Sequence, residues 1–256
     1  MGGEMKAIQR DFLPVDLRRE ISATGIDGTV AVQARQSLDE TRWLLELAAT
    51  NDFIKGVVGW LPLSSPQARR DMEGLAANLK LKGVRNVLQG EADELWLRNA
   101  QFNAGMDALT EFGLVYELLV FERQLQAAIT FVDQHPSQIF VLDHLGKPRV
   151  KEGQLEPWKR HICELAKREN VCCKISGLVT EADWSAWREA QLRPYVETVL
   201  EAFGSSRVMF GSDWPVCRLA CNYSRWGETV ERLTDFLSVV ERARLWGGNA
   251  SRVYRL

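Results

Sequence analysis

Short apolar runs rich in β-branched residues recur along the chain at nearly even spacing. One marker residue in each run shows this, because successive markers lie 27, 30, 28, 27, 32 and 35 residues apart. Each interval leaves room for one helix and two short loops. Runs that are apolar at nearly every position are typical of parallel strands buried on both faces. The pattern predicts seven such strands, in the runs Thr29–Ala34, Ile54–Leu61, Val84–Gln89, Leu114–Val120, Ile139–Gly146, Val171–Gly177 and Arg207–Trp214.

Helical patterns fill the intervals between these runs. Ser37 and Glu40 have the spacing of a capping box, which predicts the first turn of a helix. Apolar residues recur at helical spacing over Leu125–Val132, and His135 with the following proline predicts the end of that helix. The chain therefore alternates strand and helix from the first run to the last.

Repeated strand-then-helix units predict either a (β/α)₈ barrel or a doubly wound open sheet in a single domain over residues 1–256. The first run, Thr29–Ala34, is not followed by a glycine-rich phosphate turn, and neither GxGxxG nor GxxxxGK[ST] occurs. Their absence favours the barrel, the TIM fold. A closed barrel needs eight strands and the pattern shows seven, so we expect an opening strand to be missing upstream or to be supplied in a way that the pattern does not show.

Composition and charge exclude several classes of protein. Apolar residues make up 46% and charged residues 26% of the 256 positions, which excludes dominant disorder. The net charge of −2 argues against a sequence-independent nucleic-acid binder. No apolar run is long enough to cross a membrane, and the charged first twenty residues lack the apolar core of a secretory signal. Five cysteines, an odd number, favour a reducing compartment, so we expect a cytoplasmic protein.

Two side chains at predicted strand ends could carry chemistry, because active sites of barrels lie at the carboxyl ends of the strands. His144 follows an apolar strand and could bind a metal ion or donate to an oxyanion, or it could be a histidine satisfied by a backbone carbonyl. Asp213 could act as a general base towards water, or it could cap a turn. Asp143 alternates with His144, so we expect it on the opposite face, capping the turn or holding a loop.

The remaining histidines and cysteines are weaker candidates. His135 ends a helix and His161 lies in a charged helix, so both are expected to be solvated. Cys217 and Cys221 have no second pair with which to form a zinc ribbon, and the adjacent Cys172 and Cys173 are expected to pack inside a strand. No G-x-S-x-G elbow supports a serine hydrolase.

Two motifs resemble those of a known family. VLDHLGKP at 141–148 together with FGSDWPV at 210–216 is similar to the lactonase branch of the amidohydrolase superfamily, which includes L-fuconolactonase, L-rhamnonolactonase and 2-pyrone-4,6-dicarboxylate lactonase. Further similar stretches, such as RDFLPVDL at 10–17 and GGNASRVYRL at 247–256, extend the resemblance over nearly the whole chain.

The resemblance implies a (β/α)₈ barrel that hydrolyses a sugar-acid lactone. It implies that Asp213 activates water and that His144 polarises the lactone carbonyl or contacts a metal ion. Arg85, Lys147 and Trp214 are the implied contacts for sugar hydroxyls or a carboxylate. One divalent metal ion, zinc or manganese, is implied for the family, with His144 and Asp213 as its ligands if it binds; a metal-free site is the other alternative.

One family motif is absent from the sequence. The family begins with a strand ending in His-x-His, whereas the three histidines here are His135, His144 and His161. The missing motif belongs to the strand that the barrel count also lacks, which favours truncation of an enzyme over a new mechanism. Two alternatives to the lactonase stay open: a decarboxylase of the same superfamily, and a catalytically silent barrel that binds a ligand.

Overall fold

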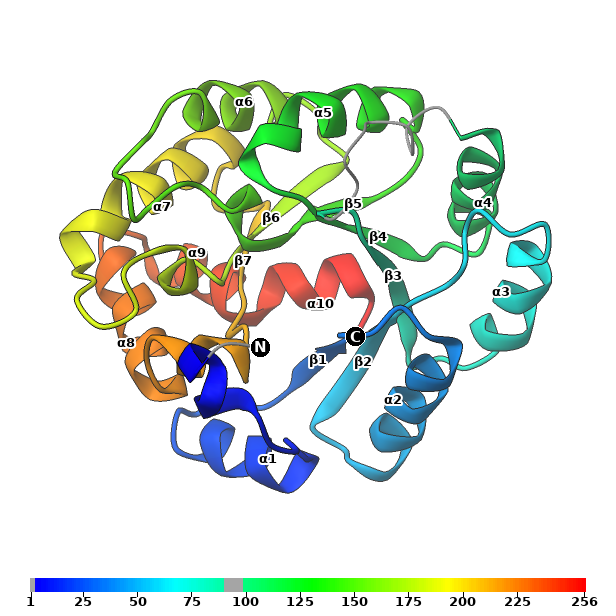
Figure 1. The fold of residues 1–256 in the computed structure, drawn as a ribbon, viewed down its shortest axis with the longest axis horizontal. Coiled ribbons are helices and arrows are strands. Elements are labelled where there is room, and N and C mark those ends of the chain that lie inside the picture. Colours follow the sequence, from blue (N-terminus) through cyan, green and yellow to red (C-terminus); the bar gives the residue numbers. More distant parts are fainter. Residues whose placement is uncertain (1–2, 90–98) are drawn as a thin grey trace.

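Seven parallel strands form one curled sheet surrounded by helices (Figure 1). The computed structural model describes residues 3–89 and 99–256. Each strand pairs with its neighbours in sequence, in the order β1 to β7. All seven predicted strands are confirmed, as is the barrel-type fold. Their bounds are β1 Thr29–Val32, β2 Ile54–Gly59, β3 Leu81–Val87, β4 Val115–Leu119, β5 Phe140–Leu142, β6 Val171–Ile175 and β7 Val208–Phe210.

The two edges of the sheet are β1 and β7. Within residues 3–89 and 99–256, no strand pairs with the outer edge of either. All four residues of β1 are only half-buried, whereas all five residues of β4, in the middle of the sheet, are buried. The curled sheet is therefore a barrel wall of seven strands with an opening between β1 and β7.

Helices in the β–α connections cover the outside of the sheet (Figure 1). Ser37 accepts hydrogen bonds from the backbone N–H groups of Asp39 and Glu40, as an N-cap does. Glu40 completes no capping box, because its carboxylate accepts from the N–H groups of Ala34 and Arg35 instead. In the described residues, no helix is long and apolar enough to cross a membrane. The α-helices are α1 Pro14–Ser22, α2 Leu38–Thr50, α3 Ala68–Ala76, α4 Ala100–Glu111, α5 Leu125–Gln134, α6 Trp158–Leu165, α7 Glu189–Phe203, α8 Tyr223–Leu233, α9 Val239–Ala243 and α10 Asn249–Tyr254.

Short 3₁₀ turns follow several strands, and one π-helical turn precedes α10. Three of the 3₁₀ turns follow β5, β6 and β7, so they lie at the end of the sheet where a barrel carries its active site. The turns are η1 Gly3–Ile8, η3 Glu122–Gln124, η4 Asp143–Gly146, η5 Val179–Glu181, η6 Val216–Leu219 and the π-helical η7 Arg244–Gly248.

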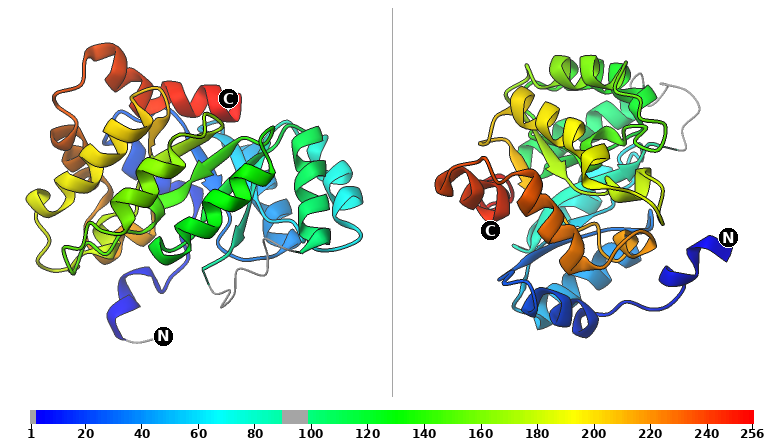
Figure 2. Two further views of the ribbon diagram at one scale, coloured as in Figure 1. Left: turned by 90° about the horizontal axis from the view of Figure 1, so that it is seen from above. Right: turned by 90° about the vertical axis from the view of Figure 1, so that its left-hand side faces the viewer.

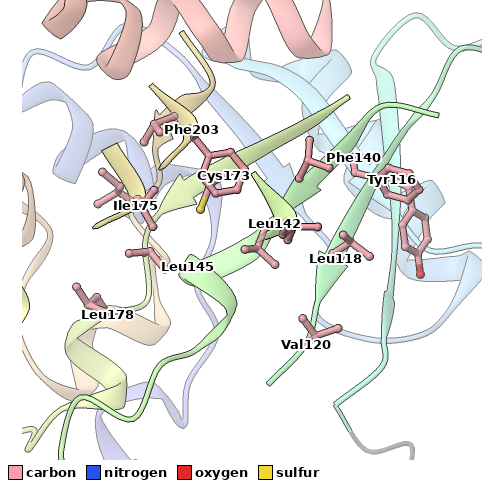
Figure 3. Close-up of a cluster of buried hydrophobic side chains, with 14 of the residues drawn as sticks. Tyr116, Leu118, Val120, Phe140, Leu142, Leu145, Cys173, Ile175, Leu178 and Phe203 are labelled. Carbon is pink, nitrogen blue, oxygen red and sulfur yellow. The ribbon is translucent and has the colours of Figure 1, made fainter. Parts of the chain in front are cut away.

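The main hydrophobic core lies between the outer face of the sheet and the helices. Alternate residues of a strand point to opposite faces, and the outward residues of β4 and β5, including Tyr116, Leu118 and Phe140, are fully buried. Figure 3 shows these side chains together with Cys173 and Ile175 of β6. The core holds the helices on the sheet.

A second, smaller apolar cluster lies on the inner face of the sheet. It contains residues that alternate with the outer core, such as Val115, Val141 and Cys172, together with Val253 and Tyr254 of α10. Helix α10 therefore closes the interior at the end where the strands begin. Figure 2 shows the C-terminal helix and the N-terminal turn η1 on opposite sides of the sheet.

Candidate active site

Asp143 faces the interior, directly after β5, and its carboxylate is completely buried. It accepts a hydrogen bond from Arg85 Nη1 at 2.8 Å and one from Lys174 Nζ at 2.9 Å. The expectation that Asp143 points to the opposite face and caps a turn is wrong. Asp143 lies two residues after Val141 and so shares its inward direction.

His144 also reaches the interior, although it is adjacent to Asp143. The reason is the backbone of η4, where His144 and Leu145 both have φ of +53° and Lys147 has φ of +48°. Such left-handed conformations cost side-chain-bearing residues about 1 kcal/mol or more each. The turn breaks the strand alternation, so that two consecutive polar side chains enter one space.

The imidazole of His144 is held by β6 and the residues after it. Its Nδ1 lies 2.8 Å from Ser176 Oγ, and a Cβ at Gly177 would lie only 2.7 Å from the same ring nitrogen. Gly177 also has φ of +62°, so glycine is required there both for its conformation and for the close approach of the ring. The pKa of His144 is lowered, because burial outweighs the opposing effects of Asp213 and Asp143.

Asp213 lies just after β7 and meets His144 across the interior. Its Oδ1 is 3.7 Å from His144 Nε2, and both side chains are only slightly exposed. The separation is longer than a hydrogen bond, but both atoms can contact one shared water or substrate oxygen. The structure therefore brings together the two residues that the sequence predicted as the catalytic pair.

A buried ion network lies beneath this pair. Lys174 of β6 donates to Glu117 of β4 at 2.6 Å as well as to Asp143, and Tyr254 of α10 donates to the same Glu117 oxygen. Burial raises the pKa of Glu117, as does the nearby Asp143, and Lys174 and Arg85 only partly oppose this. Burial would also raise the pKa of Asp143, but Lys174 and Arg85 lower it far below its usual range. The network runs from the closing helix α10 to the strand end that carries His144.

Arg85, Lys147 and Trp214, the three implied substrate contacts, lie in different surroundings. Arg85 binds Asp143 and the backbone oxygen of Gln33. Among the residues that the structure describes, its Nε is buried without a hydrogen-bond partner, and so is the indole Nε1 of Trp214. Lys147 pairs with Glu181 at 2.8 Å and lines a cavity of about 750 Å³, whose lining includes neither His144 nor Asp213.

The described residues do not by themselves form a catalytic zinc site. Across residues 3–89 and 99–256, no group of three or more His, Cys, Asp or Glu side chains is placed to hold a metal ion. His144 and Asp213 offer two donors, and a catalytic zinc usually takes three protein ligands. The nearby Arg85, which helps to lower the pKa of His144, adds positive charge that opposes a cation.

Sequence analysis missed Glu117, Lys174, Ser176 and Tyr254. A signal for two of them was present, because Glu117 and Lys174 are the charged residues inside the apolar strand runs LVYELLV and VCCKIS. A charge in a buried strand needs a partner. His135 was expected to be solvated, which is wrong: it is 8% exposed, and its Nε2 lies 2.7 Å from Asn103 Oδ1.

Comparisons with known proteins cover nearly the whole chain. The sequence model described as amidohydrolase matches residues 4–256. Two curated proteins named L-fucono-1,5-lactonase are similar. The one from Burkholderia multivorans is 43% identical, with 100% of this chain and 90% of the relative covered. The one from Burkholderia ambifaria is 39% identical, with 98% of this chain and 88% of the relative covered.

A solved structure has nearly the same fold. The crystal structure of an amidohydrolase from Burkholderia multivorans with bound zinc has a TM-score of 0.96 and 42% identity to this chain. The match covers 100% of this chain and 92% of that one. The sequence and structure comparisons thus agree over the same extent of the chain.

Proposed function

Because the chain belongs to the amidohydrolase family, we propose that it hydrolyses the lactone of a sugar acid, of the L-fuconolactone or L-rhamnonolactone type. The observation that carries the proposal is the pair of His144 and Asp213, with Nε2 and Oδ1 3.7 Å apart at the carboxyl ends of β5 and β7. The similarity expected from the DHLGKP and GSDWP motifs is confirmed at the level of the family. Decarboxylation is less supported, because the curated relatives at 39–43% identity are lactonases.

In the proposed reaction, Asp213 and His144 both act in the step in which water adds to the lactone carbonyl group. The Asp213 carboxylate accepts a proton from a water molecule as its oxygen attacks the lactone carbonyl carbon. His144 is neutral because burial lowers its pKa, so its Nε2–H can donate to the carbonyl oxygen as negative charge develops. This tautomer requires that Nδ1 accept from the Ser176 hydroxyl, for which the 2.8 Å separation is suited.

Ring opening completes the proposed reaction. The bond between the carbonyl carbon and the ring oxygen breaks, the ring oxygen takes up the proton held by Asp213, and the product is a hydroxy acid. At neutral pH this acid ionises, so each turnover releases one proton to the solvent. Arg85 Nε and Trp214 Nε1 are buried donors that have no partner within residues 3–89 and 99–256. They are suited to bind hydroxyl or carboxylate oxygens of the substrate, with Lys147 at the rim.

The proposal assigns no chemical step to a metal ion. His144 and Asp213 would be the ligands for zinc or manganese among the described residues, one protein ligand fewer than a catalytic zinc usually has. Metal analysis of the purified protein and of His144→Asn addresses this directly. An ion bound through His144 falls to background in the variant, and an unchanged metal content excludes His144 as a ligand.

A cytoplasmic location remains part of the proposal. All five cysteines are free in the structure, which is consistent with a reducing compartment. The proposed partner is the small lactone itself.

Proton release on mixing the protein with L-fucono-1,5-lactone or L-rhamnono-lactone tests the proposed function. Asp213→Asn is expected to lower kcat/KM by about 10²- to 10⁴-fold, the usual contribution of a general base. The matched control is Asp235→Asn, an exposed carboxylate between α8 and α9, which is expected to keep the wild-type rate. Full activity of Asp213→Asn contradicts the assignment of the base.

Two other results would replace the lactonase. Release of carbon dioxide without ring opening would identify the decarboxylase. A melting-temperature shift with sugar acids, without turnover of any lactone, would identify a silent ligand-binding barrel.

A further inference from the structure

A second cavity lies at the end of the sheet opposite to His144 and Asp213. Its volume is about 430 Å³, within the usual range for a small-molecule site. One wall is formed by the residues that precede β4, β5, β6 and β7, among them Gly113, Asn170 and Arg207. Arg252 and Arg255, in and just after α10, form the other wall. Figure 2 shows α10 at this end of the sheet.

Three arginines line this cavity, and their hydrogen bonds are to neutral groups. Arg207 donates to the backbone oxygens of Ala166, Arg168 and Val171. Arg252 donates to the backbone oxygen of Ser206, and Arg255 donates to that of Gly113. In the part of the chain that the structure describes, none of the three forms an ion pair with a carboxylate.

Some arginines elsewhere in the described chain do form ion pairs with carboxylates. Arg168, whose backbone oxygen binds Arg207, forms ion pairs with Asp133 and Glu164. Arg232 of α8 pairs with Glu189. The cavity lining therefore holds three guanidinium groups that, within the described residues, pair with no carboxylate.

Charged groups around the cavity are mostly positive. Glu169 is the acidic residue in its lining, and it is exposed. Burial lowers the pKa of Lys82, and the nearby Arg255 and Lys80 lower it further. At the cavity wall, burial raises the pKa of Cys172, and Arg252 partly opposes this. An anion in the cavity would be attracted by the charged forms of Arg252, Arg255 and Lys82.

We propose that this cavity binds a small molecule bearing a phosphate group or two carboxylates. A guanidinium presents paired N–H donors that match the oxygens of a phosphate or carboxylate, and such charge-assisted hydrogen bonds are about twice as strong as neutral ones. Three arginines line a cavity sized for one small ligand, and Ser137 and Ser206 also belong to its lining. A ligand held there joins α10 to the segments that precede four strands.

Binding of inorganic phosphate, pyrophosphate and citrate to the full chain tests the inference. Calorimetric titration and melting curves are run against sodium chloride of equal ionic strength. We expect at least one of these anions to raise the melting temperature of the wild type beyond the chloride control. Arg252→Gln and Arg255→Gln are each expected to weaken its binding at least tenfold. Because both arginines are exposed, neither variant is expected to impair folding.

The matched control is Arg42→Gln, an exposed arginine on α2 that pairs with Asp39 and is expected to bind the anion as the wild type does. Preference for pyrophosphate identifies a phosphorylated ligand, and preference for citrate a polycarboxylate. The inference is overturned if none of the three anions exceeds chloride. It is also overturned if both cavity variants bind as tightly as the wild type.

Discussion

The two faces of the curled sheet carry different chemistry. The outer face is a continuous apolar core in which Tyr116 and Phe140 pack edge to face with ring centroids 6.1 Å apart (Figure 3). The inner face has a small apolar cluster at one end, followed by the charged side chains of Glu117, Asp143 and Lys174 towards the other. The same strands therefore contribute stability on one side and reactive groups on the other.

This difference follows from the alternation of side chains along a strand. Helices cover the outer face, so apolar area is buried there without any need for partners. The inner face of a barrel is equally buried, but each charge in it must be compensated by another. Substitutions on the outer face should therefore change stability, and substitutions on the inner face should change activity as well.

The largest loss of stability is expected on the outer face. Phe140→Ala removes a fully buried ring from β5 and is expected to lower the free energy of unfolding by about 4 kcal/mol. The rate per folded molecule should stay at the wild-type value, because the ring points away from His144 and Asp213. Urea denaturation combined with the lactone assay measures both quantities. A large loss of kcat in the folded fraction would break the distinction between the faces.

A somewhat smaller loss of stability, with a loss of activity, is expected inside the barrel. Lys174→Met leaves Glu117 and Asp143 without their shared cation and is expected to cost about 3 kcal/mol. Activity should fall too, because Asp143 is adjacent to His144. The double variant Glu117→Gln/Lys174→Met is the control, because it also removes the carboxylate charge of Glu117 that Lys174→Met leaves unpaired. Its loss of free energy of unfolding should be smaller than the sum of the losses of the two single variants. Additive losses would show that the two residues do not interact.

The smallest effect is a change in the pH dependence of stability. The pKa of His144 is lowered in the folded state, chiefly by burial, so the unfolded chain binds protons more readily. Above the ordinary histidine pKa of about 6.5, His144 is neutral in both states and the free energy of unfolding is not reduced by it. As the pH falls below about 6.5 towards the pKa of the folded state, the unfolded chain takes up the proton first, and the free energy of unfolding decreases by at most about 1.4 kcal/mol per pH unit. Urea denaturation between pH 5 and 8 should therefore show a shallower slope for His144→Gln than for the wild type. Identical slopes would contradict the lowered pKa.

Sequence alone was sufficient to locate the strands and to single out His144 and Asp213, which the structure brings together. Apolar runs located β1 to β7, and polar residues at strand ends identified His144 and Asp213. The direction of Asp143 was predicted wrongly, because strand alternation does not foresee the left-handed residues of η4. The spacing of apolar residues near the C-terminus predicts a helix, but it does not show that α10 closes the interior or that Tyr254 contacts Glu117. Such contacts depend on long-range packing.

The most direct test of the account is a double-mutant cycle on the lactone-opening rate with Asp213→Asn, His144→Asn and the double variant. If the two side chains act on one carbonyl group in the same step, the double variant should be about as slow as the slower single variant. If instead the two losses multiply, the residues act independently, and the shared catalytic step is contradicted.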